Sequence, residues 1–215
     1  MREAVLSMER RLGDLEGDIL LVQGNLAITL FDLGRHEESL RMTREVYAGS
    51  VRFYGAEHPE SLREAGNHAV SLEALDRFEE AKALLHETIL VARRVLGESH
   101  YVTLKMRKVY AIALYRDTGA TLDDLREAVE TFEEIERIAR RFLGAANPFT
   151  STIEGNLRNA RAVLRARETP SETPGSFQRA SEEKLRTRRV VSVADRFRRP
   201  AAETPGGDDS RSTDL

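Results

Sequence analysis

Five histidines are the residues of this 215-residue chain best suited to bind a transition metal. No two of them have the i, i+4 spacing with which a helix holds zinc, and cysteine, the other common zinc ligand, is absent. His58 and His100 lie 42 residues apart, in similar sequence surroundings. We therefore expect no metal site, and we interpret these two histidines as structural residues of a repeated turn.

Pairs of neighbouring acidic residues could supply the two carboxylates of a general acid–base mechanism. They occur at Glu37-Glu38, Glu79-Glu80 and Asp123-Asp124. Each pair stands where a helix is expected to begin, and negative charge there is stabilised by the helix dipole. The sequence holds no nucleophile-elbow, phosphate-binding or dinucleotide-binding motif. We expect a non-enzymatic protein with no cofactor and no small-molecule substrate.

The composition does not favour membranes or nucleic acids as partners. Thirty-three Lys and Arg residues against 36 Asp and Glu residues give a net charge of −3, so no global field attracts a polyanion. The longest apolar run, residues 109–115, has seven residues, whereas a membrane-spanning helix needs about 18. No signal-peptide core follows Met1. These features predict a cytoplasmic protein without a membrane span.

A repeat of 42 residues organises the chain. Residues 55–58 recur at 97–100, and residues 25–27 match 67–69, both 42 residues apart. A degraded copy of the first segment begins at Gly144, 47 residues after Gly97. Each period holds two stretches with apolar residues at helical spacing, and no stretch alternates apolar and polar residues over strand length. The chain is therefore predicted to be all-α and built of stacked helix pairs.

The repeat predicts where the helices lie. We call the first helix of each pair helix A and the second helix B. Helix pairs are expected over 18–33 and 37–54, over 60–75 and 78–96, and over 102–117 and 122–143, with a closing helix over 148–165. The third helix B gains five residues, and Thr121 or Asp123 could cap it.

The N-terminus is expected to lie inside a repeat. A shift of 42 residues places Gly13 at the phase of Gly55, which predicts a separate helix over 2–12, equivalent to the end of a helix B. This segment would pack against the first helix A, while its other side would lack a partner. We therefore expect exposed apolar surface there, and either further chain upstream or self-association through the uncapped N-terminus.

The composition changes near residue 166. Of residues 166–215, 12 of 50 are apolar, and this stretch holds four of the six prolines. Such a segment cannot bury enough apolar surface to offset the entropy of ordering. The sequence predicts a repeat array over 1–166 and a disordered tail over 167–215. Residues 179–199 carry eight basic and three acidic residues, which leaves tail-mediated contact with nucleic acid or anionic lipid as an alternative function.

The repeated text resembles tetratricopeptide repeats, and its 42-residue period resembles the kinesin light chain type. The resemblance rests on Asn-Leu-Ala in helix A and on Leu-Gly-x-x-His-Pro between periods, and it covers residues 2–165. It implies a right-handed α-superhelix of about three repeats with a capping helix. It also implies that the helices A line a concave groove that binds a partner peptide. No heptad region of the kind found in kinesin light chains is recognised.

The resemblance implies that asparagines of helix A bind the peptide backbone, and it carries over to Asn25, Asn67 and Asn156. The pattern fails at Val109, and the same asparagines could instead bridge neighbouring helices. Leu21, Arg63 and Lys105 lie one helical turn earlier and should share the groove face. Lys108 completes the peptide-binding set.

The uneven distribution of charge favours an acidic ligand. The third helix A holds Lys105, Arg107, Lys108 and Arg116 against Asp117, whereas its helix B, over 121–143, holds seven acids against four arginines. A basic inner face with an acidic outer face attracts carboxylates, although a solvated face of mixed charge explains the counts as well. We expect a non-enzymatic adaptor that binds a partner peptide. The alternative is a fragment or regulatory segment of a larger repeat protein.

Overall fold

The computed structural model describes residues 2–169, with side chains from residue 15 onward, as seven α-helices. These are α1 (Arg2–Asp32), α2 (His36–Tyr54), α3 (Pro59–Ala74), α4 (Phe78–Val95), α5 (Tyr101–Arg116), α6 (Leu122–Phe142) and α7 (Pro148–Glu168). No strand occurs within residues 2–169. The all-α prediction is confirmed for this part of the chain, and the predicted bounds of α2 to α6 agree to within a residue or two.

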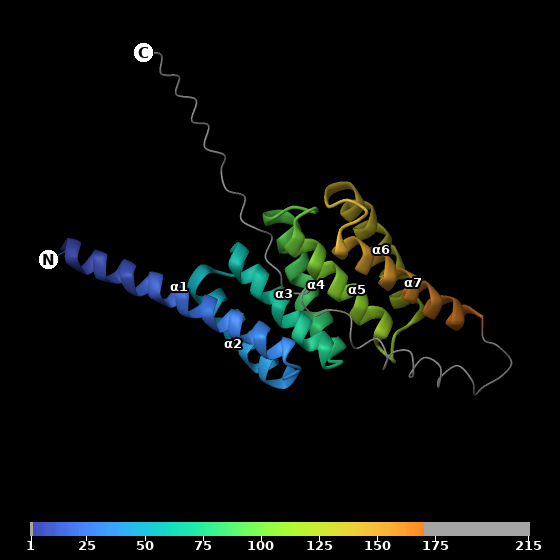
Figure 1. Cartoon of the computed structure of the whole chain (residues 1–215), viewed down its shortest axis with the longest axis horizontal. Coiled ribbons are helices and arrows are strands. Elements are labelled where there is room, and N and C mark those ends of the chain that lie inside the picture. The colour runs from blue at the N-terminus through green and yellow to red at the C-terminus, as the bar shows by residue number, and fades with distance from the viewer. Residues whose placement is uncertain (1, 170–215) are drawn as a thin grey trace, which may run out of the picture.

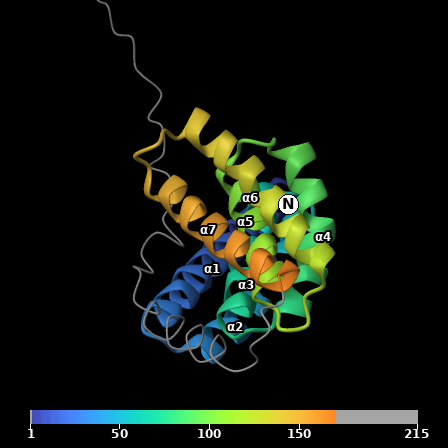
Figure 2. The same ribbon diagram turned by 90° about the vertical axis from the view of Figure 1, so that its right-hand side faces the viewer.

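The helices form an elongated, curved stack (Figure 1). Each helix packs against the next one along the chain; α3 also packs against α5, and α5 against α7. Within the described residues, the helices B (α2, α4 and α6) show no comparable packing against one another. The helices A therefore form the inner layer of the stack, and the helices B form its outer layer, seen end-on in Figure 2.

The turns between repeats are built alike. Gly55, Gly97 and Gly144 follow a helix B with φ of 93°, 95° and 88°, a left-handed region that glycine enters without steric cost. Three residues later, a side chain caps the next helix A: His58 accepts from the N–H of Glu60, and His100 from that of Val102. Asn147 does the same in the last turn. The structural role predicted for the two histidines is thus confirmed.

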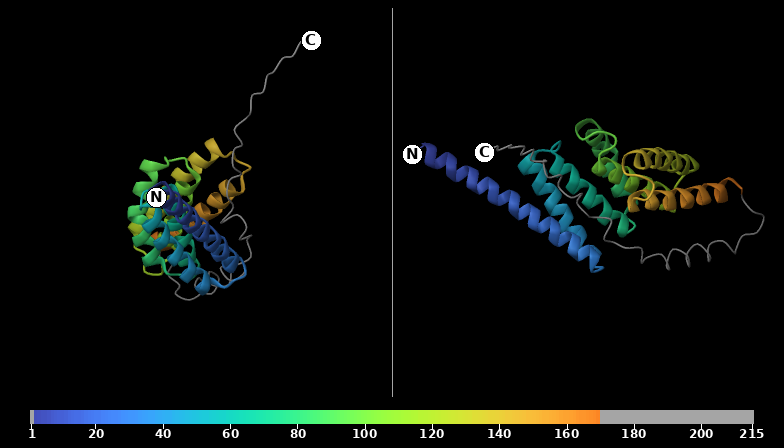
Figure 3. Two further views of the ribbon diagram at one scale, coloured as in Figure 1. Left: turned by 90° about the vertical axis from the view of Figure 1, so that its left-hand side faces the viewer. Right: turned by 45° about the horizontal axis from the view of Figure 1, so that its top comes forward.

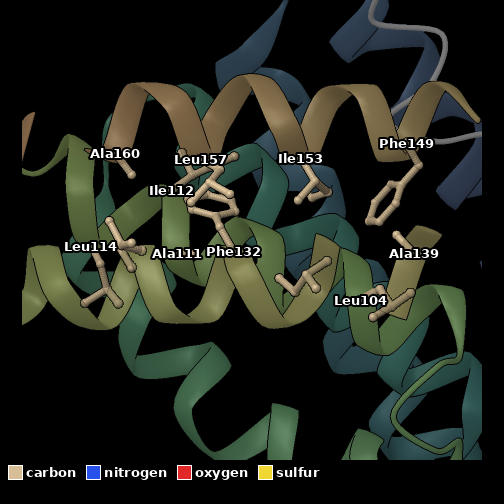
Figure 4. Close-up of a cluster of buried hydrophobic side chains, with 13 residues drawn as sticks. Leu104, Ala111, Ile112, Leu114, Phe132, Ala139, Phe149, Ile153, Leu157 and Ala160 are labelled. Carbon is tan, nitrogen blue, oxygen red and sulfur yellow. The ribbon is translucent and has the colours of Figure 1, made fainter. Parts of the chain in front are cut away.

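The largest buried cluster lies at the C-terminal end of the stack. Figure 4 shows the side chains of α7 pointing toward those of α5 and α6. Ile153 and Phe132 are fully buried there, and Leu104 of α5 joins them. A second cluster, around Leu62, Leu85 and Met106, joins α3, α4 and α5. The two central helices A, α3 and α5, therefore each pack between two helices B.

The predicted break at Gly13 is wrong. The first helix runs without interruption from Arg2 to Asp32, so residues 2–12 cannot fold back to pack against it. The position three residues after Gly13 holds Glu16, where the other turns place His58, His100 or Asn147 as the cap. Without a helix-starting residue at this phase, nothing favours a new helix, and the existing one continues.

The closing helix extends one turn farther than predicted. Glu168 pairs with Arg126 of α6 at 3.1 Å, and Arg167 donates to the backbone oxygens of Ala120 and Thr118 at 3.3 and 3.4 Å. Residues 167 and 168 therefore belong to the array and not to the tail. The predicted disorder of the tail, and its alternative function, otherwise concern residues 170–215, which lie outside the described residues.

Candidate peptide-binding surface

The inner layer opens into a cleft at the first repeat, between α1, α2 and α3. It has a volume of about 540 Å³, and we call it the inner cleft. Its lining residues are Gly17, Asp18, Leu20, Leu21, Ser50, Phe53, Tyr54, Glu60, Arg63 and Glu64. The structure thus brings together Leu21 and Arg63, two of the residues that the sequence predicts for peptide binding.

The charge of the inner cleft is acidic and not basic. Arg63 forms ion pairs with Glu60 and, at 2.8 Å, with Glu64. Asp18 is the third acid of the lining, so three carboxylates surround one guanidinium. Arg63 is already neutralised within the chain, and this end of the surface favours a cationic or hydrogen-bond-donating group of a ligand.

A chain of buried polar groups links the three N-terminal helices A. Glu64 of α3 is buried, and its carboxylate lies against Gly24 of α1. A Cβ atom added to Gly24 would lie 3.5 Å from Oε1 of Glu64. The Asn67 side-chain amide donates to Glu64 at 3.0 Å, and its oxygen accepts from Lys105 Nζ of α5 at 2.7 Å. Asn67 and Lys105 are each 5% exposed. In this structure Asn67 therefore bridges neighbouring helices, which is one of the two roles that the sequence allows.

The other predicted residues do not join this chain. Asn25 is exposed on α1. Asn156 is half-buried on α7, where its side-chain oxygen accepts from the Tyr115 hydroxyl at 3.1 Å. Lys108 is 7% exposed, and its Nζ atom lies 5.3 Å from the centre of the Phe149 ring. The three asparagines thus have three different environments, and their binding of a peptide backbone stays a prediction.

Two of the basic residues counted for the third helix A do not serve the inner face. Arg107 is buried and pairs with Glu134 of α6 and, at 3.4 Å, with Glu98. Arg116 pairs with Glu73 of α3 and, at 3.0 Å, with Asp76. The expected basic face therefore reduces to two buried lysines, Lys105 and Lys108, because the arginines neutralise acids of neighbouring elements.

Sequence reasoning missed Glu64. It occupies the repeat position that holds Val22, Met106 and Ile153 in the other helices A. A single acid at an otherwise apolar position is the signal that could have identified it, because a buried carboxylate requires partners. Here those partners are Arg63 and Asn67.

A second cavity, of about 430 Å³, lies on the outer side between α2, α3 and α4. His68 lines it and has its Nδ1 atom 3.2 Å from the hydroxyl of Thr43. Burial, together with the positive charges of Arg44 and Arg77, lowers the pKa of His68 to about 4. The imidazole is therefore neutral at physiological pH, and it serves as a packed hydrogen-bonding group.

Other kinds of site find little support in the described part of the chain. Within residues 2–169, no three histidine or acidic side chains lie close enough together to hold a metal ion. Over the same residues, no helix is both long and apolar enough to cross a membrane.

Comparisons with known proteins agree with this geometry. Residues 20–60 and 65–101 match the tetratricopeptide repeat family. The fold is similar to that of a Podosopora anserina protein with nearly identical TPR-like repeats, which is assigned to the kinesin light chains. The two structures have a TM-score of 0.55 and 22% sequence identity, over 78% of this chain and 93% of that chain. BtubC (BKLC) from P. vanneervenii has a TM-score of 0.47 and 14% identity over 75% and 69% of the two chains. No curated protein matches in sequence. The first likeness confirms the predicted superhelical fold.

Proposed function

We propose that this chain, whose residues 20–60 and 65–101 match the tetratricopeptide repeat family, is a non-enzymatic adaptor that binds a peptide segment of a cytoplasmic protein along its inner face. Repeat arrays of this class are protein-interaction scaffolds that present extended inner surfaces. The observation that carries the proposal is the inner cleft, in which Leu21 and Arg63 meet beside the polar chain that leads to Lys105.

The inner cleft has the mixed lining that peptide recognition needs. Leu21, Phe53 and Tyr54 supply apolar walls, and Arg63 with its acidic partners supplies a few charged groups. Apolar walls provide binding free energy, and a few placed polar groups fix orientation. We propose that a basic or amide-bearing side chain of the peptide enters this acidic end.

The opposite end of the proposed path is basic. Lys105 and Lys108 of α5 are the predicted contacts for acidic residues of the peptide. To reach a carboxylate, Lys105 must leave Asn67, which frees the Asn67 side-chain oxygen to accept from an N–H of the peptide backbone. Asn67 and Lys105 should therefore change partners together when the peptide binds. Their mutual hydrogen bond would be replaced by two hydrogen bonds to the peptide, one from each residue. Asn25, exposed on α1, offers a further backbone contact without such an exchange.

A display of random 15-residue peptides, screened against the full chain, tests this proposal. Selected peptides should combine a basic residue with an acidic one farther along. Asn67→Ala should weaken their binding by about 1–3 kcal/mol, and Lys108→Ala should weaken the binding only of peptides that carry the acidic residue.

Arg41→Glu is the matched control for a charge reversal at Arg63, because Arg41 is exposed on α2 and does not line the inner cleft. The control should leave the affinity unchanged. If the double change Asn67→Ala with Arg63→Glu also leaves it unchanged while the peptide still binds, the inner face is not the binding surface.

A further inference from the structure

The first helix carries an apolar stripe that no other part of the described chain covers. Leu15, Ile19, Val22 and Leu26 are 56%, 48%, 65% and 47% exposed, and we call them the α1 stripe. Their spacing of four, three and four residues places them along one side of the helix. The opposite side of α1 is buried against the array through residues such as Leu20, Ala27 and Phe31.

The repeat shows what normally covers this face. Ile19, Val22 and Leu26 correspond to Ser61, Glu64 and His68 in α3, to Thr103, Met106 and Tyr110 in α5, and to Thr150, Ile153 and Leu157 in α7. In α3, α5 and α7, this face is turned toward the preceding repeat. His68 bonds to Thr43 of α2, Thr103 to the backbone of Ala92 in α4, and Met106 lies against Gly66 of α3. The α1 stripe is therefore an interface surface without its partner.

In the described part of the chain, no helix B precedes α1 to cover the α1 stripe in the way that helices B cover the same face of α3, α5 and α7. In α3, α5 and α7, a turn three residues before the helix reverses the chain, so that the preceding helix B folds back over this face. In α1, the helix continues straight through the corresponding position to Arg2. Figures 1 and 3 show this N-terminal half extending beyond the rest of the array. Within residues 2–169, therefore, no other helix covers the α1 stripe.

The spacing of the stripe identifies the kind of partner. Counted as a heptad repeat, Ile19 and Leu26 take a positions and Leu15 and Val22 take d positions; in the sequence, Leu12, Met8 and Val5 continue the same spacing upstream. An apolar 3.5-residue repeat over residues 5–26, about three heptads, is the pattern of helices that coil around one another. It becomes visible only because α1 continues through Gly13, where the sequence predicts a break. This pattern is self-complementary, because a and d residues of one helix fit between those of an identical helix.

The flanking charges are compatible with such a pairing. No charged residue occupies an a or d position between 5 and 33. In a parallel pair, the g position of one helix faces the following e position of the other. Asp18 would then face Gln23 of the second helix, so no like charges oppose each other at this pair.

We propose that the α1 stripe joins two copies of this chain through a two-stranded coiled coil of their first helices. This interface lies on the side of α1 away from Leu20, Ala27 and Phe31, and Asp18 borders both the interface and the inner cleft. The proposal is independent of peptide binding. It adds a bivalent arrangement, in which two arrays present two peptide-binding surfaces from one coiled coil.

Sedimentation equilibrium of the full chain over a range of concentrations tests the proposal. Wild-type protein should be a dimer. The double variant Ile19→Glu with Val22→Glu places charges at the centre of the coiled coil and should raise the dissociation constant about 100-fold or more, without lowering the helix content measured by circular dichroism. The matched control Leu90→Glu, at an exposed leucine of α4 that is 59% exposed, should stay dimeric.

Two results would overturn the proposal. The first is a wild-type monomer at every concentration that stays soluble. The second is a dimer that the double variant does not weaken, because the contact would then lie elsewhere. If the double variant loses helix content, Val22→Gln provides the second measurement, since a neutral polar side chain at one d position should still weaken the dimer more than Leu90→Gln does.

Discussion

The two ends of the array use the same repeat position in different ways. Where α3 meets the first repeat, the shared face holds Ser61, Glu64, His68 and Ser71. Two of them bond to α2: His68 lies 3.2 Å from the Thr43 hydroxyl, and the Ser71 hydroxyl lies 3.4 Å from that of Ser39. Where α7 meets α5 and α6, the corresponding residues are Thr150, Ile153, Leu157 and Ala160, three of which belong to the largest apolar cluster. The same backbone geometry thus carries a polar junction at one end and an apolar junction at the other.

This difference shows how a repeat array divides its tasks. Apolar packing is non-directional and stabilises in proportion to the area that is buried, which suits the closing helix. A polar junction contributes less net stability per contact, because its groups exchange water for protein partners. The polar groups of this junction can, however, exchange their protein hydrogen-bond partners for a ligand. The inner cleft opens beside the polar junction. We therefore expect stability to depend mainly on the C-terminal end and recognition on the N-terminal end.

The largest expected effect is a core truncation at the C-terminal end. Phe132→Ala should destabilise the protein by about 3–5 kcal/mol, because the ring is fully buried among α5 and α7 side chains. Urea unfolding followed by circular dichroism measures the change. Phe142→Ala, whose ring is 58% exposed on the same helix, is the control and should change the free energy of unfolding by less than about 0.5 kcal/mol. Equal effects would contradict the apolar junction.

The bridge between Asn67 of α3 and Lys105 of α5 should show coupling between its two partners. Lys105→Met removes the donor to the buried Asn67 side-chain oxygen and should cost about 1–3 kcal/mol. Combining it with Asn67→Leu should cost less than the sum of the single changes, because the oxygen that lost its donor is removed as well, while Glu64 keeps its ion pair with Arg63. A double-mutant cycle of unfolding free energies measures this coupling, and strict additivity would argue against the bridge.

The junction at His68 should weaken in acid. The pKa of His68 is about 4 in the folded chain, against about 6.5 when unfolded. Folding therefore favours the neutral ring, so its stabilisation is complete above about pH 6.5 and is lost as the pH falls toward 4. Between about pH 7 and pH 5 the expected loss is about 2 kcal/mol.

Urea unfolding at the two pH values measures this loss. His68→Gln should remove it, whereas His86→Gln, at an exposed site on α4, should keep the wild-type pH dependence. An unchanged dependence in the His68 variant would show that the ring titrates near its ordinary value in the folded chain.

The smallest effect is expected at the start of α6. Thr121 accepts from the Asp124 N–H at 3.1 Å, and Asp124 accepts from the Thr121 N–H at 2.7 Å, which together form a capping box. Thr121→Ala should cost about 1 kcal/mol, and Thr121→Ser almost nothing. Thermal unfolding compares the two. Equal losses would mean that the methyl group of Thr121, and not its hydroxyl, stabilises the turn.

The local features of this protein can be predicted from its sequence. The 42-residue period, the helix pairs and the structural role of His58 and His100 in the turns all follow without coordinates. Each depends on residues close together in the chain: glycine ends a helix, a polar side chain starts the next, and apolar spacing selects the buried face. The capping residue Thr121 was predictable for the same reason.

Which polar groups meet depends on how the helices pack. The sequence counts Arg107 and Arg116 as basic residues of the inner layer, but their charges are neutralised by acids of other helices. It allows Asn67 two roles, and the position of Lys105, 38 residues away, determines the one seen here. The continuity of α1 was also missed, because a glycine ends a helix only when the next residues can start another. Such pairings join residues far apart in the chain, and local spacing carries no information about them.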